Sequence, residues 1–318
     1  MSQSSSALHT LLQNAADEGD LSQVSVSVLQ SMDLTPVINN ALGTSPDMVS
    51  ANEAILLGML IDDSSSIEQY GNVPNVISGT NLVLDAQLAS KQRDAMLVHI
   101  ALLNGTQLCE YRPLESMFRL ISKEDLVALL RAKEPKVVYE VGEAASQLRI
   151  PENELVERIE WGERLAIDSY NLASESWAIY WPTGGTPLYK ESIPFYAKVV
   201  AKTQELRDAG IAVRSIELTN TDGEDLHSGQ VTASDVSKIV ADMLRTERHI
   251  VAGMGIQMPK VDFRTVYGGM GIQPRWILTP KNKPAEIRAA FMTFSQSAQR
   301  ASQSAASFSQ TAVGGFGK

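Results

Sequence analysis

The chain has 318 residues, of which 44% are hydrophobic and 20% charged, a balance typical of a globular protein. No apolar run approaches the roughly 20 residues that span a bilayer, and the first residues lack the basic and apolar stretches of a secretory signal. The single cysteine, Cys109, excludes an intrachain disulfide and favours a reducing, cytoplasmic location. We therefore expect one large domain, or one domain with a substantial insert, and no membrane partner.

The negative charge is concentrated at the start of the chain. The formal net charge is −10, yet no Lys or Arg precedes Lys91, while the first 90 residues contain ten of the 37 acidic residues. The other 27 acidic residues balance the 27 basic ones. Such a surface repels phosphate backbones and attracts cations or basic partners, so we expect no nucleic-acid ligand.

The predicted elements alternate between strands and helices. Residues 1–50 are expected to form an N-terminal arm, with a helix over 7–16 and a strand over 24–28, where Val alternates with Ser. Residues 55–61 are continuously apolar, which is typical of a central strand covered on both faces. Further helices are predicted over 80–92, 187–209, 234–247, 261–267 and 284–311, and further strands over 95–103, 106–111, 211–218, 250–254 and 275–279.

The order of these elements predicts the fold class. Asn104-Gly105 separates two strand-like runs, which is a strong signal for a tight hairpin, so the second and third strands should be antiparallel neighbours. The remaining strands alternate with helices. We therefore expect a doubly wound, Rossmann-like α/β fold whose mostly parallel sheet has one antiparallel edge strand. This domain would comprise residues 51–118 and 177–318.

Residues 119–176 interrupt the alternation, because they are charged and helical in pattern without a convincing strand. We interpret them as a helical insert. Residues 141–162 resemble the small helix-turn-helix of excisionase-type and MerR-type regulators, with Ala145 expected to pack against Leu155. The second helix of this segment is rich in glutamate, which would repel a nucleic-acid backbone, so contact with protein is the favoured role.

Three short motifs follow or precede the predicted strands and helices. Asp62-Asp63-Ser64-Ser65-Ser66 follows the first strand and fits the pattern Asp-x-Ser-x-Ser. Gly184-Gly185-Thr186 precedes the long helix that starts near Pro187, which Thr186 is also expected to cap. Thr221-Asp222-Gly223 follows the strand that ends near Leu218. Open α/β sheets bind ligands at the carboxyl ends of their strands, so these motifs are expected to meet there.

The residue types in the motifs suit a hard divalent cation. Mg²⁺ requires about six oxygen ligands and retains water strongly. Hydroxyl groups two residues apart, on Ser64 and Ser66, can face one ion, and Thr186 can add a third oxygen. Asp62 and Asp222 would supply negative charge directly or through water. With few direct carboxylates the ion stays electrophilic, so an acidic group from a partner is its best remaining ligand.

Together and in this order, the motifs resemble the metal-ion-dependent adhesion site of the von Willebrand factor A family, over residues 55–279. The resemblance implies that Ser64, Ser66 and Thr186 contact Mg²⁺, or Mn²⁺ or Ca²⁺, with Asp62 and Asp222 as water-mediated or second-shell ligands. The insert departs from the family, which usually has a short connection there. The helix over 289–309 is similar to the ends of bacterial members associated with tellurite resistance and stress.

Other readings of these residues are open. The serines after Asp62 could form a turn that caps the next helix, and Asp222 could be only a turn residue. His227 follows Asp222 closely and is a further candidate, whereas His99 is expected in the core. With four histidines and one cysteine a zinc enzyme is not expected, and an aspartyl-phosphatase would need a carboxylate at the position of Ser64.

The sequence therefore predicts a non-catalytic, divalent-cation-dependent adaptor that binds a protein, such as an ATPase or a component of a stress-response complex, inside a bacterial cell. The alternative is a structural subunit of a self-assembling complex, in which the N-terminal arm and the insert make the contacts. The two differ in behaviour, because the adaptor should release its partner in EDTA while the subunit should self-associate with or without metal.

Overall fold

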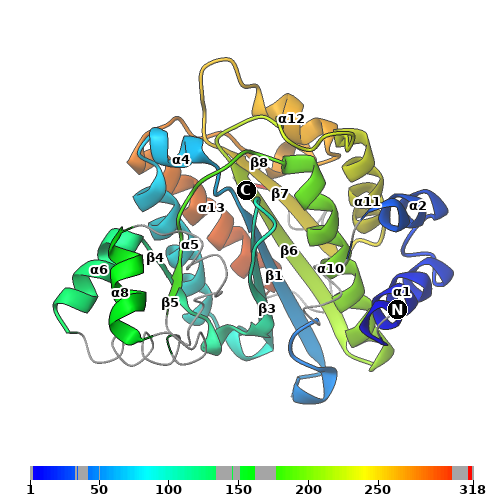
Figure 1. Ribbon diagram of the computed structural model, residues 1–318. Helices are drawn as coiled ribbons and strands as arrows, with labels where there is room; N and C mark the ends of the chain where they lie inside the picture. The colour runs from blue at the N-terminus through cyan, green and yellow to red at the C-terminus, as the bar shows by residue number, and fades with distance from the viewer. Residues whose placement is uncertain are drawn as a thin grey trace.

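The computed structural model describes residues 3–32, 34, 42–49, 51–133, 145, 151–161, 177–302 and 314–316. Its centre is a six-stranded sheet in the order β3-β2-β1-β6-β7-β8 (Figure 1). Only β2 and β3 are antiparallel, and all other neighbours in this sheet are parallel. The predicted α/β fold with one antiparallel edge strand is therefore confirmed. The strands are β1 (Glu53–Ile61), β2 (Met96–Leu102), β3 (Gln107–Pro113), β6 (Ala212–Thr221), β7 (His249–Gly255) and β8 (Ile277–Leu278).

Helices cover both faces of this sheet. One face carries α5 (Val73–Leu88) and α13 (Pro284–Ser302), which pack against each other. The other carries α10 (Leu188–Asp208), α11 (Ala233–Arg245) and α12 (Phe263–Gly269). The strands β1, β2 and β7 are buried on both faces, which explains their continuous apolar sequences. Shorter elements are α4 (Ser65–Gln69) and the 3₁₀ turns Pro46–Met48, Arg93–Ala95, Leu114–Ser116 and Pro274–Trp276.

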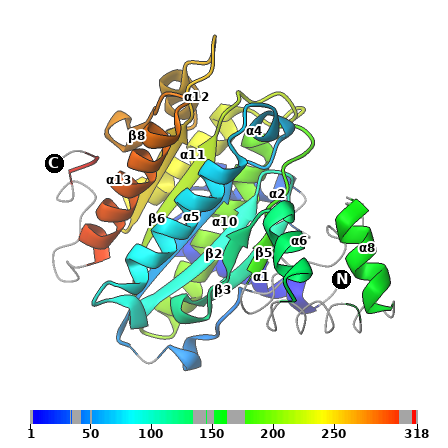
Figure 2. The same cartoon turned by 90° about the vertical axis from the view of Figure 1, so that its left-hand side faces the viewer.

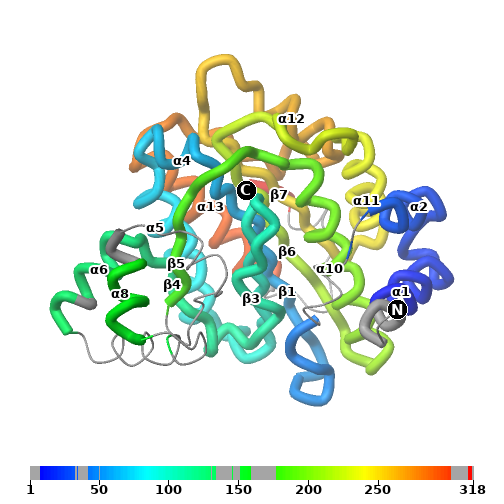
Figure 3. The backbone as a smooth tube through the Cα atoms, in the orientation of Figure 1, coloured from blue at the N-terminus to red at the C-terminus, as the bar shows by residue number. Residues whose placement is uncertain are grey.

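The N-terminal arm is helical where it is described. The helices α1 (Gln3–Asp17) and α2 (Gln23–Ser31) lie against α10 and α11, as the blue segments of Figure 3 show. The strand predicted over 24–28 is therefore wrong. Ser22 caps α2, and Asp242 of α11 accepts hydrogen bonds from the Ser22 and Ser25 hydroxyls at 2.7 and 2.6 Å. This contact, rather than the β propensity of valine, determines the local structure.

The insert begins and ends with a strand, which the sequence pattern did not predict. β4 (Arg119–Ile121) and β5 (Trp177–Ile179) pair in parallel as a separate two-stranded sheet. α6 (Lys123–Arg131) and α8 (Glu152–Trp161) lie beyond it, to one side of the main sheet (Figure 2). Ala145 and Leu155 share a small apolar cluster with residues of β4, β5 and α6, as expected. Most of the predicted helix-turn-helix before Glu152 lies outside the described residues.

Two helix boundaries differ from prediction. α5 starts at Val73 rather than near residue 80, because Pro74 occupies its first turn, where the missing N–H is tolerated. α13 is described to Ser302, and residues 303–311 of the predicted helix lie outside the described part. In the part of the chain that the structure describes, no helix combines the length and apolar character needed to cross a membrane.

The contact between α5 and α13 depends on Gly79. A Cβ atom at this position would overlap the ring of Phe291, which is fully buried on α13. Alanine is normally the better helix former by about 1 kcal/mol. Even so, Gly79→Ala should lower the free energy of unfolding by about 2 kcal/mol, since overpacking a core costs about 1–3 kcal/mol. Urea unfolding tests this, and Phe291→Leu should restore most of the loss in the double variant; simple additivity of the two changes would contradict the prediction.

Candidate functional site

The carboxyl ends of β1 and β6 bring two of the predicted motifs together. These strands are parallel neighbours, and Ile61 pairs with Asn220 in their register. Asp62 and Asp222 follow these two residues directly, and both carboxylates are buried. The Asp62 N–H donates to the Asn220 backbone oxygen at 3.1 Å, which continues the pairing into the loops. The fold therefore places segments 158 residues apart in sequence side by side.

The carboxylate of Asp62 organises both loops. Its Oδ1 accepts the backbone N–H of Ser64 at 2.8 Å, and its Oδ2 accepts the Thr221 hydroxyl at 2.5 Å and the Asp222 N–H at 3.3 Å. Complete burial raises the pKa of Asp62, and these hydrogen bonds oppose the rise. Both oxygens are therefore engaged by protein donors, which suits a residue that acts on a cation through charge or water.

The two predicted serines lead from Asp62 to Asp222. The Ser64 and Ser66 hydroxyl oxygens are 2.9 Å apart, and the Ser66 hydroxyl donates to Asp222 Oδ1 at 2.5 Å. Asp222 Oδ2 is buried and accepts no hydrogen bond of ordinary geometry. Burial raises the pKa of Asp222 to about 6, which the Ser66 hydrogen bond only partly offsets. Four of the five predicted residues thus form one connected cluster.

Thr186 reaches this cluster from the far side of the insert. After β5, Tyr180 donates a hydrogen bond to the Asp62 carbonyl, and the chain then crosses the loop that follows β1. There the Thr183 N–H donates to the Asp63 carbonyl at 2.5 Å, and the Ser65 N–H donates to the Gly184 carbonyl at 3.2 Å. Figure 1 shows this segment passing from β5 over the top of the sheet to α10. Thr186 is buried at its end.

The fifth predicted residue also faces the segment that carries Asp222. A Cβ atom on Gly223 would lie 3.4 Å from Thr186 Oγ1, so the glycine leaves room for that hydroxyl. Thr186 does not cap α10, contrary to expectation. Instead Asp225 Oδ1 accepts the Tyr189 N–H at 3.2 Å and Ser228 Oγ accepts the Lys190 N–H at 2.8 Å. The Thr186 hydroxyl is therefore not used as a helix cap.

The donor set fits a hard divalent cation. Hydroxyl oxygens of two serines converge on a carboxylate whose second oxygen is buried without a partner, and such an oxygen is costly to leave unmatched. Among the described residues no group of three or more His, Cys, Asp or Glu side chains is arranged to bind a metal. A cation here would therefore depend on serine and threonine oxygens, which Mg²⁺ accepts more readily than Zn²⁺ does.

Several residues that support the site were not identified as site residues from the sequence. They are Thr221, Tyr180 and Asp63, whose Oδ1 accepts the Asn104 N–H of the β2–β3 turn at 2.9 Å. Asp63 and Thr221 lie beside predicted residues, so proximity in sequence was an available signal. Tyr180 had none, because its contact depends on the course of the chain after β5.

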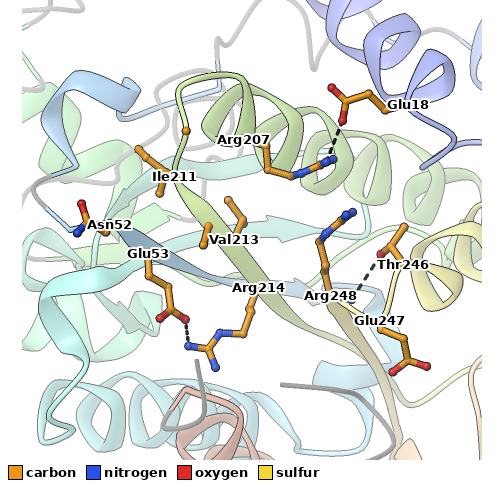
Figure 4. Close-up of a pocket in the computed structure, with 12 residues that line it drawn as sticks. Glu18, Asn52, Glu53, Arg207, Ile211, Val213, Arg214, Thr246, Glu247 and Arg248 are labelled. Atoms are coloured by element: carbon orange, nitrogen blue, oxygen red, sulfur yellow. Dashed lines mark hydrogen bonds and ion pairs between the residues drawn. The ribbon is translucent and has the colours of Figure 1, made fainter. Parts of the chain in front are cut away.

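A cavity of about 740 Å³ lies at the opposite edge of the sheet, at the amino ends of β1, β6 and β7 (Figure 4). Its three arginines are already paired with acids: Arg214 with Glu53, Arg207 with Glu18 and Asp20, and Arg248 with Asp20. Glu18 and Asp20 follow α1, so these pairs attach the N-terminal arm to the domain. The cavity therefore offers an incoming anion little uncompensated positive charge.

Comparisons with known proteins give distant structural similarities. No protein-family model matches the chain, and no curated protein matches it. Proximal thread matrix protein 1 from the mussel byssus is similar, with a TM-score of 0.41 and 11% identity over 78% of this chain and 46% of that one. The pilus adhesin SpaC from Lactobacillus rhamnosus GG, in an open conformation, has a TM-score of 0.42 and 11% identity over 78% of this chain and 30% of that one. The chain thus spans less than half the length of these proteins.

Proposed function

We propose that this chain is a von Willebrand factor A-type domain that binds one divalent cation, Mg²⁺ in the first place, and uses it to bind a protein. Ser64, Ser66 and Thr186 would contact the ion, and Asp62 and Asp222 would act through water or from the second shell. The observation that carries the proposal is the Ser66–Asp222 contact, at 2.5 Å, beside a buried carboxylate oxygen without a partner. The sheet, parallel except for the edge strand β3, agrees with such a fold.

The chemistry of the site favours a partner that offers a carboxylate. Serine and threonine hydroxyls are neutral ligands, so the bound ion would keep much of its positive charge. An acidic side chain of another protein would neutralise that charge, whereas water and neutral groups would do so less well. Within the cell the partner would belong to an ATPase or a stress-response assembly, as expected from the sequence.

Two adjacent serines provide a matched test of cation binding. Ser66→Ala removes a proposed ligand, and Mg²⁺ affinity should fall at least about tenfold, the scale on which loss of metal-site groups acts. Ser65→Ala is the control, because the Ser65 hydroxyl faces the Gly184 carbonyl at 3.1 Å instead of the cluster. Calorimetric titration of the full chain with Mg²⁺, Mn²⁺ and Ca²⁺ measures both. Equal affinities for Ser66→Ala and the unchanged protein would contradict the site.

The same pair of variants tests the role in protein binding. In Mg²⁺, the unchanged protein and Ser65→Ala should retain the same protein from a native lysate, and EDTA or Ser66→Ala should release it. Sedimentation with and without EDTA tests the alternative of a structural subunit. Self-association at micromolar concentration in both conditions would favour that alternative and contradict the adaptor.

A further inference from the structure

The segment that follows Asp222 holds Thr186 by its backbone. The Thr186 N–H donates to Nδ1 of His227 at 2.9 Å, and the Thr186 carbonyl accepts the Leu226 N–H at 3.2 Å. Gly223 of the same segment faces the Thr186 hydroxyl. The loop after β6 therefore supplies Asp222 and also fixes the peptide groups on both sides of Thr186.

The imidazole of His227 occupies space that Gly185 leaves open. A Cβ atom on residue 185 would overlap Cγ, Nδ1 and Cε1 of the ring. Gly185 is not among the glycines with positive φ, so its backbone conformation is open to other residues. The glycine is required here for the close approach of the ring, and any larger residue would push His227 away from Thr186.

The hydrogen bond has a chemical direction. Because the Thr186 N–H is the donor, Nδ1 must carry a lone pair and the ring proton must be on Nε2. Thr186 is buried, so losing the acceptor would leave a buried N–H without a partner, at a cost of about 1–3 kcal/mol. His227 itself is exposed. Burial therefore does not explain its place, and its contact with Thr186 is the feature to account for.

We propose that His227 is a positioning residue of the candidate metal site, which holds Thr186 so that its hydroxyl stays beside the segment carrying Asp222. The inference rests on the proposed cation site and adds a residue to it. Asp225 and Ser228, on either side of His227, cap α10. The loop 222–228 thus fixes both the start of α10 and the residue two positions before it.

Three variants test this role. His227→Ala removes the acceptor, and the Mg²⁺ dissociation constant should rise about tenfold, since second-shell partners typically change metal affinity by that much or more. In His227→Asn the side-chain oxygen can replace Nδ1, so affinity should return to within about threefold of the original. Gly185→Ala should weaken Mg²⁺ binding as His227→Ala does, because the added methyl group displaces an unaltered ring.

His249→Ala is the matched control for a general loss of stability. His249 is buried at the start of β7, at the opposite edge of the sheet, where its Nδ1 contacts the Ser215 hydroxyl at 2.7 Å. Its replacement should lower the unfolding temperature without changing the Mg²⁺ dissociation constant. In metal-free protein, hydrogen exchange of the Thr186 amide should accelerate in His227→Ala and not in His249→Ala.

The outcomes separate the two proposals. If the unchanged protein binds Mg²⁺ and His227→Ala binds it equally well, the role of His227 is wrong and the metal site stands. A failure of asparagine to restore affinity would also overturn the inference, because the acceptor atom would then not be what matters. If the unchanged protein binds no divalent cation, the proposed function and the inference both fail.

Discussion

Glu217→Gln is expected to raise the free energy of unfolding by up to about 5 kcal/mol near pH 9, and to change it little near pH 4.5. The reason is the position of the carboxyl group, which is completely buried in the central strand β6. Burial raises its pKa from 4.5 to about 8, and contacts from Ser215 and the Gly58 backbone offset this only in part. Ionising Glu217 in the folded protein is therefore costly.

The carboxyl group lies over Gly58 in the middle of the sheet. Gly58 of β1 pairs with His99 of β2 on one side and with Glu217 of β6 on the other. A Cβ on Gly58 would overlap the Glu217 carboxyl group and contact the Phe195 ring of α10. Neither Glu217 oxygen, nor Nε2 of His99, has a hydrogen-bond partner of ordinary geometry. Nothing near Glu217 compensates a negative charge fully.

The titratable groups around Glu217 favour its neutral form. On β2, burial holds the pKa of His99 well below its usual value, so this ring carries no charge. On β3, burial and the Glu217 charge raise the pKa of Tyr111 well above its usual value. Lys198 of α10 is paired with Glu110 of β3. No cation is therefore directed at Glu217 to stabilise its carboxylate.

The sign of the pH dependence follows from the raised pKa. The folded state binds the proton more tightly than the unfolded chain, so the contribution is complete below about pH 4.5 and is lost as pH rises to about 8. Glutamine is neutral throughout and removes this loss. Urea unfolding at a series of pH values measures the difference, with Glu157→Gln on the exposed face of α8 as the control. Parallel pH profiles for Glu217→Gln and the unchanged protein would contradict a buried, neutral Glu217.

Local patterns predicted the strands of the main sheet because each has a distinctive sequence. Residues 55–61 form a strand buried on both faces, and Asn104-Gly105 forms the turn between antiparallel β2 and β3. The same reasoning failed for residues 24–28, where the alternation of Val and Ser fits a strand as well as a helix. There the decisive contact is with Asp242, more than 200 residues away. Contacts of this kind leave no local pattern.

The site shows the same division between local and distant information. Asp62, Ser64, Ser66 and Asp222 were proposed from short motifs, and the parallel pairing of β1 with β6 brings them together. The parts that fix their geometry come from elsewhere in the chain. Tyr180 reaches Asp62 from the end of the insert, and the caps of α10 come from the loop after β6 rather than from Thr186. Sequence patterns predicted the oxygen atoms but not the supports that orient them.

The buried charge of Asp62 gives the proposed site a measurable cost in the absence of metal. Burial raises the pKa of Asp62, so its ionised form at neutral pH destabilises the metal-free protein. Asp62→Asn removes this charge, and the asparagine oxygen can still accept the Ser64 N–H. Its amide can donate to the Thr221 hydroxyl, which in turn can donate to the Gly223 carbonyl at 3.1 Å. We therefore expect Asp62→Asn to unfold at a higher temperature than the unchanged protein in EDTA.

Saturating Mg²⁺ should reverse that order. At about one hundred times the dissociation constant, a ligand that binds only the folded state stabilises it by about 2.7 kcal/mol. The unchanged protein should gain this stability, whereas Asp62→Asn should gain none, because the charge that attracts the ion has been removed. Thermal unfolding of both proteins in EDTA and in Mg²⁺ measures the effect, with Ser65→Ala expected to follow the unchanged protein. An Asp62→Asn protein that Mg²⁺ stabilises as strongly as the unchanged one would show that Asp62 has no part in binding the cation. A residue whose charge costs stability without the ion and is needed with it acts on a ligand, which separates a binding site from a turn that only caps a helix.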